Sequence, residues 1–160
     1  MRLIREELLR RGVSEDYIIY MNFESFEWMD VKEAKALYTY IREVTKVSGK
    51  YYILLDEIQE VTDWDKAVNA FLVDLDGDIY VTGSNSRLLS SEFSTYLAGR
   101  YVAFHIMTLS FREYLLFHNV PLAISASDRK AEFLKYLRMG GFPAIHTANY
   151  DYNPIYKIVY

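Results

Sequence analysis

The sequence of 160 residues contains no cysteine. Disulfide scaffolds, thiolate zinc sites and cysteine nucleophiles are therefore excluded. Glycine and proline are also scarce, at seven and three residues, which excludes collagen-like repeats and low-complexity linkers. No apolar run approaches the roughly 18 residues of a membrane span, and residues 1–20 lack the pattern of a signal peptide. We expect a soluble, cytoplasmic protein with no membrane partner.

The apolar content is sufficient for a packed core, because hydrophobic residues make up 51% of the sequence and aromatic residues 16%. The net charge is −4, and acidic side chains are concentrated between Asp56 and Asp78, where Lys66 is the only basic residue. A surface of this charge repels phosphate backbones unless a cation intervenes. The charge pattern therefore gives no support for nucleic-acid binding.

Strand patterns and helix patterns alternate along most of the chain. Apolar and aromatic runs predict strands at 17–23, 51–56, 78–82 and 101–107. Helical spacing of apolar residues predicts helices at 3–11, 30–44, 62–75, 111–117 and 128–138. Strands that alternate with helices in this way form right-handed β-α-β units. The sequence therefore predicts an α/β fold, with a mainly parallel sheet and helices on both faces.

Polar residues ahead of the helices predict where they begin. The predicted caps are Asp30 with Glu33, Thr62, and Ser110 with Glu113. The alternation of strands and helices ends after residue 108, where the chain becomes helical. We therefore predict an α/β core over residues 1–108 and a small helical region over 109–160.

The strand at 51–56 ends in two adjacent acids, Asp56 and Glu57. Ligands of open parallel sheets bind outside the carboxyl ends of the strands. A carboxylate there can hold a hydrated magnesium ion, because Mg²⁺ prefers few protein carboxylates together with water and substrate phosphates. The adjacent carboxylate can orient or deprotonate an attacking water. The alternative is a strand that leaves the sheet through two solvated acids.

Two further segments contain candidate site residues. Ser84 and Asn85 follow the strand at 78–82, where they could reach a phosphate or a water, although both are also ordinary turn residues. Arg100 precedes the strand at 101–107, where a guanidinium could neutralise a transferring phosphoryl group or pair with a surface acid. The three histidines are scattered, so they predict neither a metal site nor a catalytic triad.

Several motifs, in order along nearly the whole chain, resemble those of one family. They are Leu54-Leu-Asp-Glu-Ile-Gln-Glu-Val61, Val81-Thr-Gly-Ser-Asn-Ser86, Leu97-Ala-Gly-Arg-Tyr101, Leu109-Ser-Phe-Arg-Glu113 and Tyr136-Leu-Arg-Met-Gly-Gly-Phe-Pro143. This set is similar to prokaryotic AAA-type P-loop ATPases, in the branch that carries a C-terminal domain of unknown function. The resemblance implies a P-loop NTPase-like fold that continues into a lid-like helical region, with ATP and Mg²⁺ as cofactors.

The resemblance also implies roles for single residues. Asp56 would be the Walker B carboxylate that holds magnesium through water, and Glu57 would be the catalytic base. Asn85, with Ser84 as the alternative, would be the sensor at the end of its strand. Arg100 would be an arginine finger that acts on the nucleotide of its own chain or of a neighbour.

One motif of the family does not occur in this sequence. There is no G-x-x-x-x-G-K-[ST] segment, and in the family this phosphate-binding loop and its strand precede the helix that here begins at Met1. We therefore expect a chain that starts inside that helix, is cut at both ends, and binds Mg-ATP weakly or not at all. The alternative function is a non-catalytic protein-interaction module on a degenerate ATPase scaffold, whose protein partner the sequence does not identify.

The strand that carries this loop lies, in the family, in the middle of the sheet. Its absence would leave two apolar strand edges unpaired, and such edges invite pairing with other molecules. We expect either self-association through these edges or a rearranged sheet.

Overall fold

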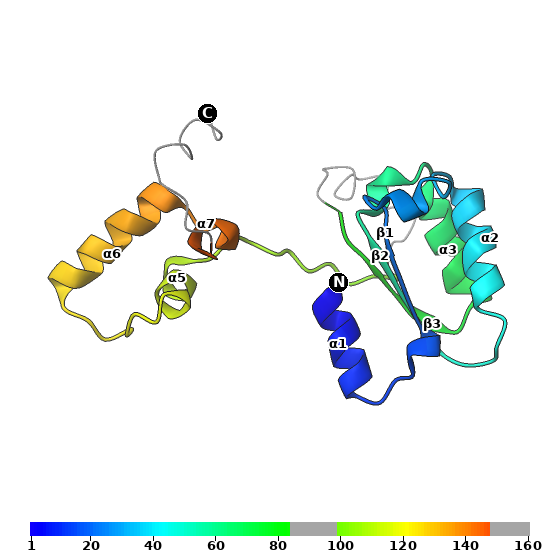
Figure 1. Ribbon diagram of the computed structural model, residues 1–160, viewed down its shortest axis with the longest axis horizontal. Coiled ribbons are helices and arrows are strands. Elements are labelled where there is room, and N and C mark those ends of the chain that lie inside the picture. The colour runs from blue at the N-terminus through cyan, green and yellow to red at the C-terminus, as the bar shows by residue number, and fades with distance from the viewer. Residues whose placement is uncertain (84–98, 148–160) are drawn as a thin grey trace. The chain divides into compact units, whose positions relative to one another are not determined.

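The computed structural model describes residues 1–83 and 99–147 (Figure 1). The chain divides into two compact units, Met1–Val102 and Ala103–Tyr160. The first unit contains a sheet with its helices, and the described part of the second is helical. No helix among the described residues is both long and apolar enough to cross a membrane.

Three parallel strands form the sheet of the first unit: β1 (Ile18–Asn22), β2 (Tyr51–Asp56) and β3 (Gly77–Val81). Their order is β1-β2-β3, so β2 is the central strand. Asn22 of β1 pairs with Asp56, and Val81 of β3 pairs with Leu55. The carboxyl ends of all three strands therefore lie at one edge of the sheet. The predicted α/β fold with a parallel sheet is confirmed, and each of these strands lies within one residue of its predicted start and end.

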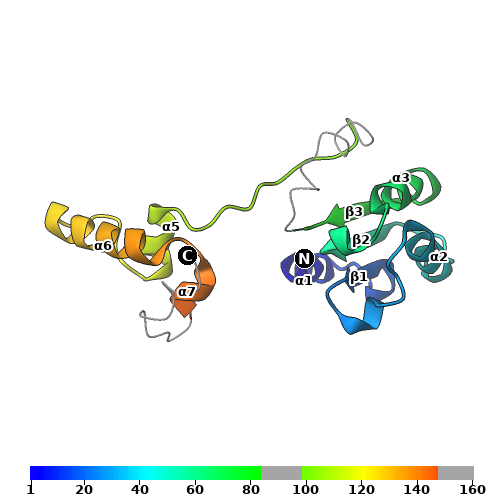
Figure 2. The ribbon, with the colours of Figure 1, turned by 90° about the horizontal axis from the view of Figure 1, so that it is seen from above.

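Helices cover both faces of this sheet (Figures 1 and 2). Helix α1 (Arg2–Arg10) packs on one face, where Leu8 joins Ile18 and Leu54 in a small buried cluster. Helices α2 (Ala34–Val44) and α3 (Trp64–Asp74) pack on the other face and enclose the larger core. Their buried side chains are Leu37, Ile41, Trp64, Ala67, Val68 and Phe71. Short 3-10 turns at Glu15–Tyr17, Phe26–Trp28 and Ile58–Glu60 connect the elements.

The pleat of β2 assigns each of its side chains to one of the two faces. Ile53 and Leu55 join the core beneath α2 and α3, whereas Leu54 between them packs toward α1. All three side chains are fully buried, which is why this strand is continuously apolar. Asp56 is in phase with Leu54, so it lies on the α1 face at the carboxyl end of the central strand.

The helix starts predicted at Asp30 and Thr62 are wrong. Helices α2 and α3 begin later, with Glu33 and Asp63 as their N-cap residues, and neither side chain makes a cap hydrogen bond. Glu33 and Thr62 form a parallel β-bridge instead, in which the Thr62 N–H donates to the Lys32 carbonyl at 2.8 Å. This bridge holds the two segments in extended conformation, so the helices can start only after it.

The second unit contains α5 (Phe111–Phe117), α6 (Ala126–Met139) and α7 (Pro143–Thr147). The capping box predicted for Ser110 and Glu113 is confirmed, because both of its hydrogen bonds are present. Leu109 donates its N–H to the Gly141 carbonyl at 2.7 Å. A Cβ atom at Gly141 would overlap the Leu109 carbonyl oxygen, so this close backbone approach requires glycine.

The strand predicted at 101–107 is wrong, because this segment has no regular secondary structure. Its side chains are exposed, with Phe104 at 83% and Ile106 at 91% of their full accessible surface. A strand needs a neighbour to satisfy its backbone N–H and C=O groups. No strand among the described residues pairs with this segment. Apolar character alone therefore did not suffice to form the strand.

Candidate functional site

Asp56, the last residue of β2, lies half-buried at the carboxyl edge of the sheet. The Tyr20 hydroxyl, from β1, donates a hydrogen bond to Oδ2 at 3.0 Å. The Thr82 hydroxyl, directly after β3, donates to Oδ1. The backbone carbonyl of Asp56 accepts a hydrogen bond from the Phe23 N–H at 3.0 Å. The carboxylate is thus held from both neighbouring strands.

Thr82 also connects Asp56 to the residues that follow it. Its hydroxyl accepts a hydrogen bond from the Glu57 N–H at 3.4 Å. Its own N–H donates to the Leu55 carbonyl, and its carbonyl accepts from the Ile58 N–H, both at 3.0 Å. Thr82 therefore continues the β2–β3 pairing beyond the strands and fixes the turn that contains Glu57.

Glu57 adopts a left-handed backbone conformation, with φ 56° and ψ 47°. This conformation is unfavourable for a residue with a Cβ atom. The Gln59 side-chain amide donates to the Glu57 carboxylate, with Nε2 and Oε2 2.5 Å apart. The other amide atom, Gln59 Oε1, is buried and has no hydrogen-bond partner among the described residues. Such an atom is commonly satisfied by an ordered water, which places a water-binding group beside Glu57.

The remaining predicted site residues are not brought to Asp56 by the described contacts. Ser84 and Asn85 lie outside the described residues. Arg100 is exposed, and its Nη1 donates to the Asn69 side-chain oxygen in the middle of α3 at 3.3 Å. The structure therefore joins Asp56 and Glu57 through Thr82, and it places Arg100 beside α3.

The donor set at Asp56 fits magnesium. It consists of oxygen atoms only: the Asp56 carboxylate and the Tyr20 and Thr82 hydroxyls that donate to it, with a second carboxylate on the next residue. Residues 1–83 and 99–147 contain no cluster of three or more metal-ligating side chains. A site with a single carboxylate suits Mg²⁺, which keeps several waters and takes further oxygen ligands from substrate phosphates.

Two residues of this site, Tyr20 and Thr82, were not predicted from the sequence. The sequence predicts Tyr20 only as part of the strand at 17–23, and Thr82 only as the last residue of the strand at 78–82. The signal that could have found them is the strand period of two, because Tyr20 and Thr82 fall on the same face as Asp56 once the register is known.

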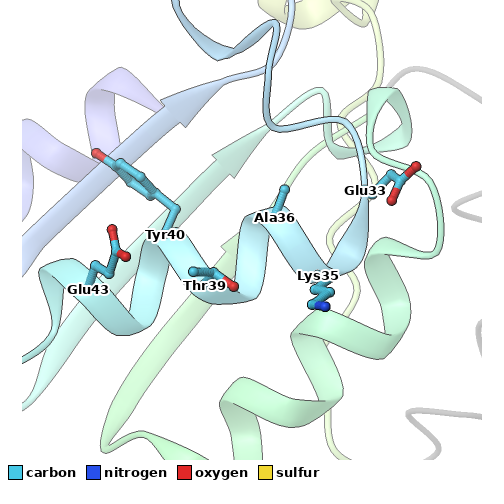
Figure 3. A pocket seen from close by; sticks show the side chains of 6 residues that line it. All are labelled: Glu33, Lys35, Ala36, Thr39, Tyr40 and Glu43. Atoms are coloured by element: carbon cyan, nitrogen blue, oxygen red, sulfur yellow. The ribbon is translucent and has the colours of Figure 1, made fainter.

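One surface depression of the described residues lies apart from these residues. It is a shallow hollow of about 450 Å³ along α2, lined by Glu33, Lys35, Ala36, Thr39, Tyr40 and Glu43 (Figure 3). Side chains of both charges and an exposed helix surface line it, with no contact to Asp56 or Glu57. We therefore assign the candidate site to the carboxyl edge of the sheet.

The fold and this edge define a parallel α/β domain with an acid pair at the end of its central strand. The family model described as AAA domain matches residues 1–115. The chain belongs to this family of AAA-type P-loop ATPases.

Two relatives have comparable sequences. An uncharacterized protein of Haemophilus influenzae is 42% identical over 146 residues, which cover 91% of this chain and 36% of the relative. An uncharacterized protein of Methanocaldococcus jannaschii is 35% identical over 144 residues, which cover 87% of this chain and 32% of the relative. The chain therefore spans about a third of the length of these relatives. No solved structure matches it significantly.

Proposed function

We propose that this chain supplies the magnesium-binding and hydrolytic edge of an ATPase core that acts in the cytoplasm, where Mg-ATP is available. The observation that carries the proposal is the Asp56 carboxylate, held by hydroxyls from both neighbouring strands at the carboxyl end of the central strand. Membership in the AAA domain family supports ATP and Mg²⁺ as the ligands.

Each acid has its own role in this proposal. Asp56 would hold Mg²⁺ through bound water, and the ion would neutralise charge on the phosphates. Glu57, one residue farther along, would orient or deprotonate the attacking water. Asn85, or Ser84 in its place, would sense the γ-phosphate, and Arg100 would act as an arginine finger in its own chain or in a neighbour.

The phosphate-binding part of such a core is not encoded in these 160 residues, which contain no G-x-x-x-x-G-K-[ST] segment. That loop supplies backbone N–H groups, a lysine and a magnesium-binding hydroxyl. We therefore propose that this chain by itself binds Mg-ATP weakly, with a Kd no tighter than about 1 mM.

The test is a titration with Mn-ATP, followed by the electron paramagnetic resonance signal of free Mn²⁺. We expect weak retention of Mn²⁺ by the wild type and a loss of retention in Asp56→Asn. Asp78→Asn is the matched control, because Asp78 lies at the start of β3, where it pairs with Lys50 at 3.0 Å. A micromolar Kd for the wild type would contradict the weak binding, and equal retention by wild type and Asp56→Asn would contradict the role of Asp56.

A second comparison of variants tests the role of Glu57 separately from that of Asp56. Glu57→Gln should lower any phosphate release from ATP by about 10²–10⁴-fold, the usual contribution of a general base. Glu60→Gln is the control, because Glu60 belongs to the same turn but faces Lys32 at 3.9 Å.

The second candidate function is a non-catalytic protein-interaction module on the same scaffold. It is favoured by the exposed apolar side chains of the second unit, which include Leu134, Leu137 and Phe142. Apolar surface of this kind commonly marks contact sites for proteins. A chain that retains no Mn²⁺ at Asp56, with or without ATP, would favour this function over the first.

A further inference from the structure

Two hydroxyl groups donate hydrogen bonds to the Asp56 carboxylate, one to each of its oxygen atoms. Tyr20 donates to Oδ2 at 3.0 Å, and Thr82 donates to Oδ1. The two donors come from opposite sides of the central strand, one from β1 and one from the end of β3. The carboxylate plane is therefore fixed at both ends.

The register of the sheet explains why these two residues reach Asp56. Tyr20 pairs with Leu54, two residues before Asp56, and Leu54 pairs with Tyr80, two residues before Thr82. Residues two apart lie on the same face of a strand. Tyr20, Asp56 and Thr82 therefore share the α1 face, and only the long phenol side chain spans the diagonal from Tyr20 to Asp56.

The side chain of Tyr20 lies in an apolar environment, while its hydroxyl reaches Asp56. The side chain packs in the cluster beneath α1, with Leu54 and Leu8. Burial and the hydrogen bond to Asp56 raise the pKa of Tyr20, and the nearby Arg2 opposes part of that rise. The phenol hydroxyl is the donor in the hydrogen bond to the Asp56 carboxylate.

We propose that Tyr20 is a positioning residue that, together with Thr82, orients the Asp56 carboxylate for the cation. A carboxylate has about four lone-pair positions. Two are used by the hydroxyls, which leaves two for the waters of a hydrated ion. This inference rests on the proposed function, because it names the residue that supports the carboxylate proposed to hold Mg²⁺ through water.

Residues that hydrogen-bond the side chain holding a metal, without contacting the metal themselves, affect the metal affinity. Hydrogen bonds to a ligating carboxylate fix its orientation, and their loss typically lowers metal affinity by 10–100-fold. Tyr20→Phe removes the hydroxyl but keeps the ring, so the packing beneath α1 is preserved. We expect this variant to retain the wild-type fold and to bind Mn²⁺ about tenfold more weakly.

The matched control is Tyr38→Phe. The Tyr38 hydroxyl also donates to a carboxylate, Asp74 Oδ2, at 2.8 Å, but it does so between α2 and α3. Both substitutions remove one phenol–carboxylate hydrogen bond. A general loss of stability would affect both variants, whereas a role at the cation site affects only Tyr20→Phe.

The first measurement is made without any metal. In protein labelled with ¹³C at the tyrosine Cζ atoms, we expect Asp56→Asn to shift the Tyr20 signal upfield, because a phenol donates more weakly to an amide than to a carboxylate. Asp74→Asn should shift the Tyr38 signal and leave Tyr20 unchanged. A Tyr20 signal that does not respond to Asp56→Asn would overturn the proposal.

The second measurement is the affinity for Mn²⁺, with and without ATP, by electron paramagnetic resonance. Weaker binding by Tyr20→Phe, with Tyr38→Phe equal to wild type, supports the positioning role. Equal or tighter binding by Tyr20→Phe overturns that role alone. If the wild type retains no Mn²⁺, the proposed function fails, and the role of Tyr20 as support for a cation ligand fails with it.

Discussion

Glu57, the residue proposed as the catalytic base, has an unfavourable backbone conformation. Its left-handed φ and ψ of 56° and 47° place the Cβ atom close to its own backbone. Thr82 holds the residue there through the hydrogen bond from the Glu57 N–H. Residues kept in such conformations often lie at functional sites, where the surrounding structure enforces them.

The cost of this conformation can be measured with two substitutions at the same position. Glu57→Gly and Glu57→Ala both remove the carboxylate, but only glycine adopts the left-handed region without strain. We expect Glu57→Gly to have the higher free energy of unfolding, by about 1 kcal/mol. Urea unfolding followed by circular dichroism gives this difference.

Glu60 provides the comparison site, because it lies in the same turn and does not have a positive φ. There the order should reverse, with Glu60→Gly less stable than Glu60→Ala, since glycine loses more conformational freedom on folding. If Glu57→Ala is as stable as Glu57→Gly or more stable, the Glu57 backbone stores no strain.

The sequence predicts part of the candidate site because that part depends on local order. Asp56 ends an apolar strand and Glu57 follows it, and ligands of parallel sheets bind at the carboxyl ends of strands. The contacts of Asp56 depend on register, which one strand does not contain. Tyr20 and Thr82 come from two other strands, so their convergence on Asp56 follows only from the pairing of all three.

At the scale of elements, a pair of histidines joins α5 to α7. The imidazole Nε2 of His118 lies 3.1 Å from Nδ1 of His146. Nε2 of His146 lies 2.9 Å from the Gly140 carbonyl oxygen, which can only accept, so this nitrogen carries a proton. In the neutral pair, His118 therefore donates to His146, and one proton lies between the two rings.

Protonation of this pair should weaken the contact between α5 and α7. Burial and the charge of His146 lower the pKa of His118, while Glu132 raises it and Lys135 lowers it. The folded chain therefore binds fewer protons at His118 than the unfolded chain. The free energy of unfolding should fall as the pH falls below about 6.5, the usual value for histidine.

This pH effect should be no more than about 1 kcal/mol, because solvent screens an exposed side chain. Urea unfolding between pH 5 and 7.5 measures it, and His118→Gln should reduce the slope. His105→Gln is the control, because His105 lies in the exposed segment at 101–107. An unchanged slope in His118→Gln would show that the pair does not set the pH dependence.

An element whose signals all lie within its own segment could be predicted from the sequence. An element that depends on pairing with a distant segment could not. The segment 111–117 has a helical pattern and a capping box within itself, and it forms that helix. The segment 101–107 is equally apolar, but its backbone has no neighbouring strand among the described residues. The starts of α2 and α3 were also missed, because the bridge between Glu33 and Thr62 joins segments far apart in sequence.

At the scale of the molecule, β3 is an edge strand. Among the described residues it pairs with β2 alone, and no described strand pairs with its other side. We propose that two copies of the chain associate through this edge, with their β3 strands antiparallel and centred on Ile79. In that arrangement Asp78 of each copy lies opposite Tyr80 of the other, and no two acids are opposed.

Two substitutions at one position test this register. Tyr80→Lys would place a cation opposite the Asp78 carboxylate, whereas Tyr80→Glu would place a second acid there. Directly opposed charges change strand pairing by up to about 1 kcal/mol for each pair. We therefore expect dimer dissociation constants that differ by about tenfold, with the lysine variant tighter.

Sedimentation equilibrium gives these constants, and the wild type should lie between the two variants. Both substitutions remove the packing of the Tyr80 ring beneath α1. This shared loss cancels when their dissociation constants are compared. A wild type that remains monomeric at high concentration would contradict association through β3.

The order of the strands in the sheet is the order of the strands in the chain. Each strand therefore pairs with the one synthesised just before it, and α2 or α3 closes each crossover on the same face. During translation, β1 and β2 can dock before β3 has left the ribosome, and β3 then adds to an existing template. These three strands can be added one at a time in the direction of synthesis, and Asp56 receives its second hydroxyl partner, Thr82, only when β3 is added.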